Sequence, residues 1–316
     1  MGPDAAALAR HRSYALFSRL FLEGVTTELV PYLKQVAQLV QQLPQPFDAD
    51  DAAASHYHVF GVNVLAYEGV FLSAQPATAQ VVEQRYQQCG YPFVANDLSS
   101  DHIGHELGHM AFLCGAEVGA WQARLPTVVH QMQMHQRAFM QDHLLRWLPA
   151  LTEAIRSQDD SFYSLMAGLV QDIVHDHAAG LLPGTSPPKF LPQPPPLLKE
   201  RSTRLQDIAA YLADPAISGI YLSRNDMAAL ARSCRLPSGF GTRQQLLENL
   251  LRAAAQYDAM SELLATIDAV AVGWERSYRS AFAPPLDAFT RPWRRNVSAT
   301  RALLKELGTA AQNVDD

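Results

Sequence analysis

The sequence predicts an all-α protein, and three observations carry this prediction. Long segments rich in Ala, Leu and Gln place apolar residues three and four positions apart, the period of a helix that is buried along one face. Residue pairs typical of helix N-termini and prolines typical of helix ends separate these segments. The run from Tyr57 to Leu65 has strand propensity in Val59, Val62 and Val64, but no second such run exists to pair with it. We expect this run to be a helix end followed by a loop.

The first helix is predicted by a wide apolar face near the N-terminus. Tyr14, Phe17 and Phe21 form one stripe of this face, and Leu16 and Leu20 form the neighbouring stripe. Because such a face must pack on other helices, we expect these side chains in the core of the first half of the chain.

A further helix is predicted to begin just after Ser99 and Ser100. Asp101 has two interpretations that the sequence leaves open: its carboxylate either completes a cap and favours the helix dipole, or it binds a ligand. His102 is interpreted as a histidine that bonds a carboxylate or a carbonyl between helices. Glu106, one helical turn later, is a candidate partner for it.

Helices continue through the second half of the chain. Apolar residues at helical spacing predict one helix over 205–212 and another over 247–254. The pairs Ser223 with Asp226 and Thr242 with Gln245 resemble capping boxes, and Asp214-Pro215 and Pro284-Pro285 predict breaks.

A proline-rich segment divides the chain. Seven prolines between Pro183 and Pro196 leave too few backbone donors for a helix or a ladder, so we expect an extended linker or wrapping arm. A length of 316 residues suits two domains of about 100–200 residues each. We therefore expect a bundle over 1–182, a linker over 183–198 and a second, smaller helical domain over 199–316.

The composition favours a globular protein of the cytoplasm. The chain is 48% hydrophobic and 18% charged, and it lacks the run of about 18 apolar residues that a membrane helix needs. At the N-terminus, positive charge follows rather than precedes a weak apolar run, the reverse of a secretory signal. Three widely spaced cysteines fit a reducing compartment, and a net charge of -6 disfavours nucleic acid as a partner.

One short motif suggests a metalloenzyme. His105, Glu106 and His109 match H-E-x-x-H, in which two histidines on one helix face bind zinc and the glutamate serves as general base. A third ligand is not evident, because Phe112 replaces the glycine of one such family, and Glu117 is too close in sequence to return to the site. We therefore interpret the two histidines as lying on a helix surface or in a polar groove, with no bound metal and no catalytic residue. A zinc metallohydrolase remains the alternative.

Read as a longer string, the same region resembles a family signature. Residues 99–113, SSDHIGHELGHMAFL, are similar to the D-H-x-x-x-E-L-x-x-M-x-x-L pattern of the TorD/DmsD/NarJ superfamily, cytoplasmic chaperones for molybdenum-cofactor enzymes. The matching positions are Asp101, His102, Glu106, Leu107, Met110 and Leu113. On this alignment His105 and His109 fall on variable positions, so the zinc motif is accidental.

Other segments resemble the family in the same order. They are residues 12–22, 67–73, 81–90 and 142–149, followed by a helix that contains Phe162 and Tyr163. Gly69 stands where the family has serine, and the family's proline-rich approach to that segment is replaced by residues 61–66. The client groove is therefore expected to differ in shape. The resemblance ends near Ala178, and the remainder of the chain is a C-terminal extension.

The resemblance implies a non-catalytic chaperone without a cofactor of its own. Such proteins bind the twin-arginine signal peptide or apoprotein of a molybdopterin-dependent oxidoreductase and hold it until its cofactor is inserted. Carboxylates would receive the arginines and an apolar channel the rest of the peptide. The residues implied for peptide binding are Tyr67, Glu68, Val70, Phe71, Asp101, His102 and Glu106. Tyr67 and Phe71, four positions apart, are more often core residues than receptor residues. A homodimer is left open.

The C-terminal half offers one local cluster. Residues 236–243, LPSGFGTR, form a glycine-rich turn just before a helix, and such a turn with Arg243 can hold an anion. The segment lacks the lysine of a P-loop, so a tight turn is the preferred interpretation.

Overall fold

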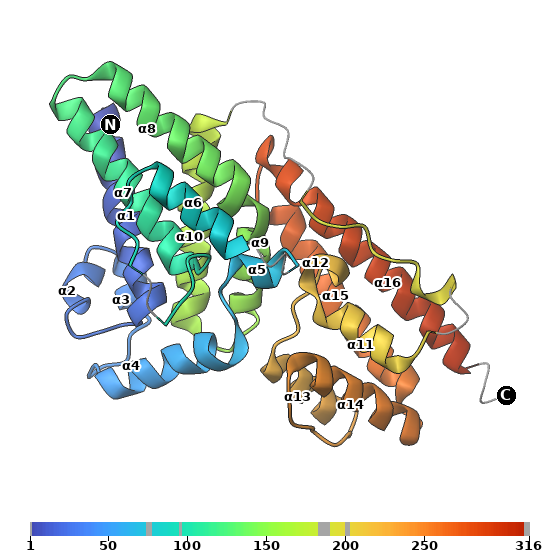
Figure 1. Cartoon of the computed structure of the whole chain (residues 1–316). Coiled ribbons are helices and arrows are strands. Elements are labelled where there is room, and N and C mark those ends of the chain that lie inside the picture. The colour runs from blue at the N-terminus through green and yellow to red at the C-terminus, as the bar shows by residue number, and fades with distance from the viewer. Residues whose placement is uncertain (1, 74–77, 95–96, 183–189, 200–202, 313–316) are drawn as a thin grey trace. The chain divides into compact units, whose positions relative to one another are not determined.

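A computed structural model describes residues 2–73, 78–94, 97–182, 190–199 and 203–312. Within these ranges the regular structure is helical and no β-strand occurs, so the all-α prediction is confirmed. The chain divides into two compact units (Figure 1). Unit 1 comprises Met1–Gly69 and Ala74–Pro188, and unit 2 comprises Val70–Ser73 and Lys189–Asp316.

The helices up to residue 182 are α1 (Pro3–Glu23), α2 (Val30–Leu33), α3 (Ala37–Val40), α4 (Ala49–His56), the π-helix η1 (Tyr57–Asn63), α5 (Glu68–Phe71), α6 (Thr78–Gln88), α7 (Ile103–Gln122), α8 (Pro126–Phe139), the π-helix η2 (Met140–Leu144), α9 (Leu145–Arg156) and α10 (Ser161–Leu181). Those in the rest of the chain are η3 (Leu197–Lys199), α11 (Leu205–Ala213), α12 (Pro215–Ser218), α13 (Arg224–Ser233), α14 (Arg243–Gln256), α15 (Met260–Ser280), η4 (Leu286–Phe289) and α16 (Arg291–Gln312).

The core of unit 1 is built around the pairing of α1 with α7. The predicted stripe of Tyr14, Phe17 and Phe21 is buried, as expected for a face that packs on other helices. α7 allows α1 to approach closely because it carries glycines on the contact face: a Cβ on Gly104 would lie 2.5 Å from Leu22, and one on Gly115 would lie 3.0 Å from His11. α8 packs on α7, and α10 packs on α9 and α1.

The segment with strand propensity continues the helix before it. α4 passes into η1, which ends at Asn63, and residues 64–66 have no regular structure, as expected for a helix end followed by a loop. Val59 and Phe60 are buried, and the Phe60 ring lies 5.3 Å from Phe21, which explains why apolar side chains with strand propensity stay in a helix. Val64 has extended backbone angles, and Tyr67 then forms an isolated antiparallel bridge with His102, the residue just before α7.

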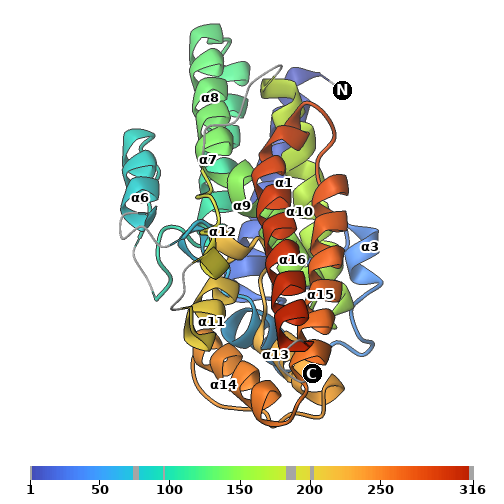
Figure 2. The same ribbon diagram turned by 90° about the vertical axis from the view of Figure 1, so that its right-hand side faces the viewer.

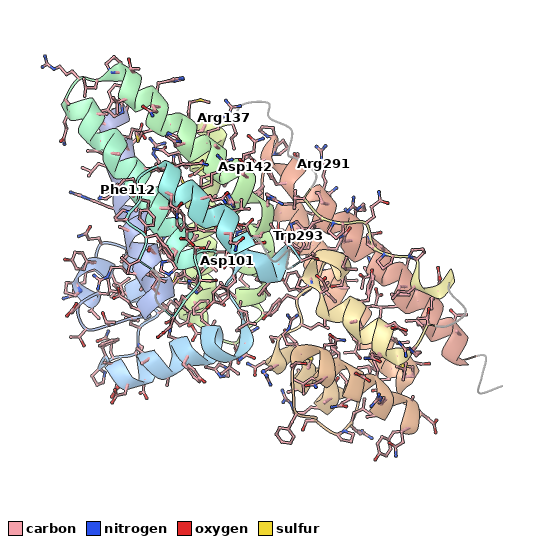
Figure 3. The ribbon with its side chains drawn as sticks, viewed as in Figure 1. Asp101, Phe112, Arg137, Asp142, Arg291 and Trp293 are labelled. Carbon is pink, nitrogen blue, oxygen red and sulfur yellow. The ribbon has the colours of Figure 1, made fainter. Side chains whose placement is uncertain are left out.

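Unit 2 is framed by the pair α15 and α16, which pack along each other (Figure 2), and by α11 on α14. Both predicted capping boxes are confirmed, since Ser223 accepts from Asp226 N and Thr242 accepts from Gln245 N. Trp293 of α16 is buried against Tyr278, at 5.6 Å between ring centroids, whereas Arg291 pairs with Asp287 (Figure 3).

The proline-rich segment is described only from Phe190 onward, and residues 183–189 lie outside the described residues. Phe190 and Leu191 are buried. The Pro192 carbonyl accepts from Arg295 Nη2 at 2.9 Å and from Asn296 Nδ2 at 3.2 Å. The described part of this segment therefore packs on α16 within unit 2.

Residues 70–73 belong to unit 2 because of what they contact. The Phe71 ring is fully buried and stacks on Tyr221, with 5.1 Å between centroids. The Arg243 guanidinium lies over the Tyr221 ring at 3.9 Å from its centroid. Ser73 Oγ donates to the Asp214 carboxylate at 3.0 Å. The domains that the sequence predicts, residues 1–182 and 199–316 joined by a linker over 183–198, stay a prediction about which segments fold independently.

None of the helices within the described ranges combines the length and apolar character that a bilayer crossing requires.

We predict that Phe71 stabilises unit 2 through its stack on Tyr221. Phe71→Ala should lower the free energy of unfolding by about 3–5 kcal/mol because it opens a cavity at a fully buried site. A double-mutant cycle with Tyr221→Ala, measured by urea denaturation, should give a coupling of about 0.5–1.5 kcal/mol. Tyr257→Ala, at an exposed aromatic, is the control. Strictly additive effects of the Phe71 and Tyr221 changes would contradict this account.

Candidate functional site

The start of α7 is fixed by His102, which is its N-cap. His102 has extended backbone angles, and its Nδ1 accepts a hydrogen bond from Gly104 N at 3.2 Å. Burial lowers the pKa of His102 to about 3, with a smaller contribution from His105, so the ring is neutral and able to accept. The interpretation of Asp101 as the cap is therefore wrong, and so is the proposed pairing of His102 with Glu106.

Asp101 instead clamps two chain segments together. Its Oδ2 accepts from Gly69 N at 3.0 Å, its backbone carbonyl accepts from Glu68 N at 2.9 Å, and Ser99 Oγ donates to its Oδ1. Beside this, Ile103 N donates to the Ala66 carbonyl at 3.0 Å. The carboxylate is thus buried but bonded, as a buried charge must be.

The clamp explains the glycine at position 69. A Cβ there would lie 3.0 Å from Asp101 Oδ2, which is tighter than an ordinary contact. The family that the sequence resembles has serine at this position. Glycine fits here because the Asp101 carboxylate lies close to the Gly69 backbone.

Behind the clamp lies a cluster of buried polar groups from α5, α7, η2 and α9. Glu68 Oε2 contacts His143 Nδ1 at 2.8 Å, and Glu68 Oε1 lies 3.9 Å from Arg146 Nη1. Glu106 Oε2 accepts from Trp147 Nε1 at 3.3 Å. Glu68, Glu106, His143 and Trp147 are each almost fully buried. We call these residues, with Arg146, the polar cluster.

Burial controls the charge of the cluster. It raises the pKa of Glu106 well above the usual range, and the negative charges of Glu68 and Asp101 raise this pKa further. Burial and these neighbouring charges therefore favour the neutral, protonated form of Glu106. Burial also lowers the pKa of the Arg146 guanidinium, which the neighbouring carboxylate of Glu68 partly offsets.

His109, the second histidine of the H-E-x-x-H motif, is buried among aromatic rings. Its ring lies 4.8 Å from Tyr86, 5.3 Å from Tyr91 and 4.7 Å from Phe139. Neither ring nitrogen has a hydrogen-bonding partner among the described residues. Burial, with His143 nearby, lowers its pKa to about 3.

The motif does not assemble as a metal site. His105 is also buried, with its ring 5.1 Å from Phe93, so the expected surface or polar-groove location of the two histidines is wrong. Across the part of the chain that the structure describes, no group of three or more His, Cys, Asp or Glu side chains is placed to hold a metal ion. The zinc-hydrolase alternative gains no support.

The sequence-derived peptide-binding residues separate into three groups. Glu68, Asp101, His102 and Glu106 meet at the clamp and the polar cluster, and all are buried. Tyr67 and Val70 retain partial exposure, with the Tyr67 ring 4.9 Å from His102. Phe71 has no exposed surface and packs in unit 2.

Sequence reasoning missed three members of the cluster. His143, Arg146 and Trp147 lie in the segment 142–149, which resembled the family but received no site role. The signal was the spacing of four between His143 and Trp147, which places both on one helix face.

Arg243 does not serve the glycine-rich segment before α14. Its Nε donates to the Leu222 carbonyl at 2.9 Å and its guanidinium covers Tyr221, so it points into unit 2. Residues 236–240 have no regular turn and residues 241–242 form a bend, so the tight-turn interpretation is not confirmed.

Comparison with known proteins gives one match. Residues 31–153 match the family model described as nitrate reductase delta subunit, and this segment contains the clamp and the polar cluster. The resembling segments 12–22 and 162–167 lie outside the match. Neither the curated proteins nor the solved structures that were searched gave a match.

We predict that Glu106→Gln reduces the decline of stability with rising pH. Because the folded pKa of Glu106 is raised, the unfolded chain loses this proton first, and wild-type stability falls as pH rises above about 4.5. Above that pH, the free energy of unfolding of the variant should rise relative to that of wild type by up to about 1.4 kcal/mol per pH unit. Urea denaturation at several pH values measures this. A stability difference that does not change with pH would contradict a protonated Glu106.

We predict that His109→Phe stabilises the protein by about 1–3 kcal/mol, because it removes two buried nitrogens without partners from an aromatic site. The gain should grow as pH falls from 6.5 towards 3, since the unfolded histidine takes up a proton there and the buried one does not. Thermal denaturation at two pH values tests this. His102→Phe is the matched control and should destabilise, because it removes the N-cap of α7.

Proposed function

The segment 31–153 belongs to the nitrate reductase delta subunit family of NarJ/TorD-type chaperones, and from this premise we propose that the chain binds the twin-arginine signal peptide or the apoprotein of a molybdopterin-dependent oxidoreductase. It is a molybdoenzyme maturation chaperone and not an enzyme. On this proposal it acts in the cytoplasm, without a cofactor of its own, and holds its client until the cofactor is inserted.

The observation that carries the proposal is the meeting of three family-like segments at one place. Residues 66–70, 99–106 and 142–147 are far apart in sequence, yet Asp101, Glu68 and His143 join them through buried hydrogen bonds. A fold that needed only a core would gain more from apolar residues at these positions, because burying carboxylates is costly. The arrangement supports a recognition role for the surface that these segments hold in place.

We assign different roles to the peptide-binding residues. Tyr67, which has exposed surface in unit 1, contacts the apolar part of the signal peptide, whereas Val70 belongs to unit 2 and is given no role in this site. Glu68, Asp101, His102 and Glu106 are positioning residues, because they are buried and hold the 66–70 segment. Phe71 fixes the end of that segment in unit 2.

The arginines of the signal peptide need an accessible carboxylate, and Asp142 offers one. Asp142 and its partner Arg85 are 39% and 41% exposed, with 3.0 Å between Asp142 Oδ2 and Arg85 Nη2 (Figure 3). An exposed pair of this kind is worth about 0–1 kcal/mol, so a guanidinium of the client is able to replace Arg85. Asp142 also accepts Arg146 Nη1 through its backbone carbonyl, which links it to the polar cluster.

We predict that the full-length chain binds a twin-arginine signal peptide of a molybdoenzyme in titration calorimetry. Asp142→Asn should weaken binding by about tenfold, because it removes a charge-assisted hydrogen bond. Asp159→Asn, at an exposed carboxylate elsewhere in unit 1, should leave binding unchanged. A peptide with both arginines replaced by alanine should lose the sensitivity to position 142.

Failure to bind any signal peptide from a panel of molybdoenzymes, with folding verified by circular dichroism, would contradict the signal-peptide proposal. Co-purification of an apo-oxidoreductase that lacks such a peptide would instead assign the chain to the apoprotein. Sedimentation of the same samples decides between monomer and homodimer.

A further inference from the structure

The α13–α14 region of unit 2 carries a surface that the proposed function does not use. Phe240, on the glycine-flanked segment between these helices, is 94% exposed. The residues just before it, Pro237, Ser238 and Gly239, form one wall of a cleft. Thus a large aromatic side chain stands in solvent directly beside a hollow.

The cleft is apolar at its base. Met227 and Ala231 of α13 and Leu250 of α14 are buried there, and Ala228 and Leu246 complete the lining. The cleft volume is about 140 Å³. An apolar cavity of about 150 Å³ is large enough to bind benzene, so this cleft has room for one large apolar side chain.

The charge around the cleft is positive although the chain as a whole carries -6. Between residues 224 and 252 five arginines face only two acidic residues, Asp226 and Glu248. Both acids are engaged, since Asp226 closes the capping box with Ser223 and Glu248 pairs with Arg252.

The arginines of α13 remain available. Arg224 lines the cleft, and Arg232 follows Ala228 by one turn in the same row of the helix, which places it beside the cleft. Arg224, Arg232 and Arg235 are all exposed.

We propose that this surface binds an acidic, amphipathic helical segment of a partner protein. One apolar side chain of the segment fills the cleft, Phe240 packs over its apolar face, and Arg224 and Arg232 contact its carboxylates. Helix-in-groove recognition of this kind combines apolar anchors with complementary charge. A twin-arginine peptide would be repelled here, so the surface is distinct from the one proposed for the client. Nucleic acid suits it less well, because its phosphates would meet the arginines but would leave the apolar cleft unfilled.

The test measures fluorescence anisotropy with the full-length chain and a labelled helical peptide that has leucine and phenylalanine on one face and glutamate on the other. We expect binding that weakens as salt is raised. Phe240→Ser should weaken it by about tenfold and Arg224→Glu by about fivefold. The matched controls are Tyr257→Ser, at an exposed aromatic, and Arg276→Glu, at an exposed arginine of α15, and both should bind as wild type.

Three results would overturn the proposal. The first is no binding of the acidic peptide, or equal binding of a peptide with lysine in place of every glutamate. The second is an equal loss of binding in the Tyr257→Ser and Arg276→Glu controls. The third is tighter binding of a DNA duplex than of the acidic peptide. None of these results bears on signal-peptide binding, so the two proposals fail separately.

Discussion

The backbone clamp between residues 66–69 and 101–103 is the constraint on which the candidate site depends. Asp101 is buried there without a cation, and it remains stable because the Gly69 amide and the Ser99 hydroxyl donate to its carboxylate. The clamp also fixes where α5 begins, since Asp101 accepts from the Glu68 amide. Every neighbouring polar group must therefore be neutral or bonded.

The two buried glutamates beside the clamp, Glu68 and Glu106, meet this requirement in different ways. Glu68 is held by His143 and lies near Arg146, so its charge has partners within unit 1. Glu106 accepts the indole N–H of Trp147, and burial together with the neighbouring Glu68 raises its pKa, which favours the neutral acid. Residues 143, 146 and 147 thus supply the hydrogen-bonding and charged partners of Glu68 and Glu106. This is a physical reason for the residue types in a segment that also resembles the family.

In unit 2 an arginine packs against a buried aromatic ring, while a phenylalanine lies in solvent. Phe71 stacks on the Tyr221 ring, and the guanidinium of Arg243, which follows the glycine-rich segment, lies over the same ring. This segment leaves Phe240 exposed, and the arginines of α13 lie at the surface. A half-buried arginine and an exposed phenylalanine in the same short segment both depart from the usual preference of their residue types. The surface of α13 and α14 therefore presents Phe240 and the arginines of α13, whereas Arg243 packs against the aromatic core beneath it.

By itself the sequence determined the all-α class, the capping pairs such as Ser223 with Asp226, and the family-like pattern, because each depends on residues a few positions apart. Only the tertiary structure decided that Asp101 bonds the Gly69 amide, that His102 rather than Asp101 caps α7, and that the zinc motif is buried. These outcomes depend on groups that lie several helical turns or more apart in the chain, or on which of two adjacent side chains adopts the extended angles of a cap. Local spacing contains no information about either, since burial and partner choice arise when distant segments meet.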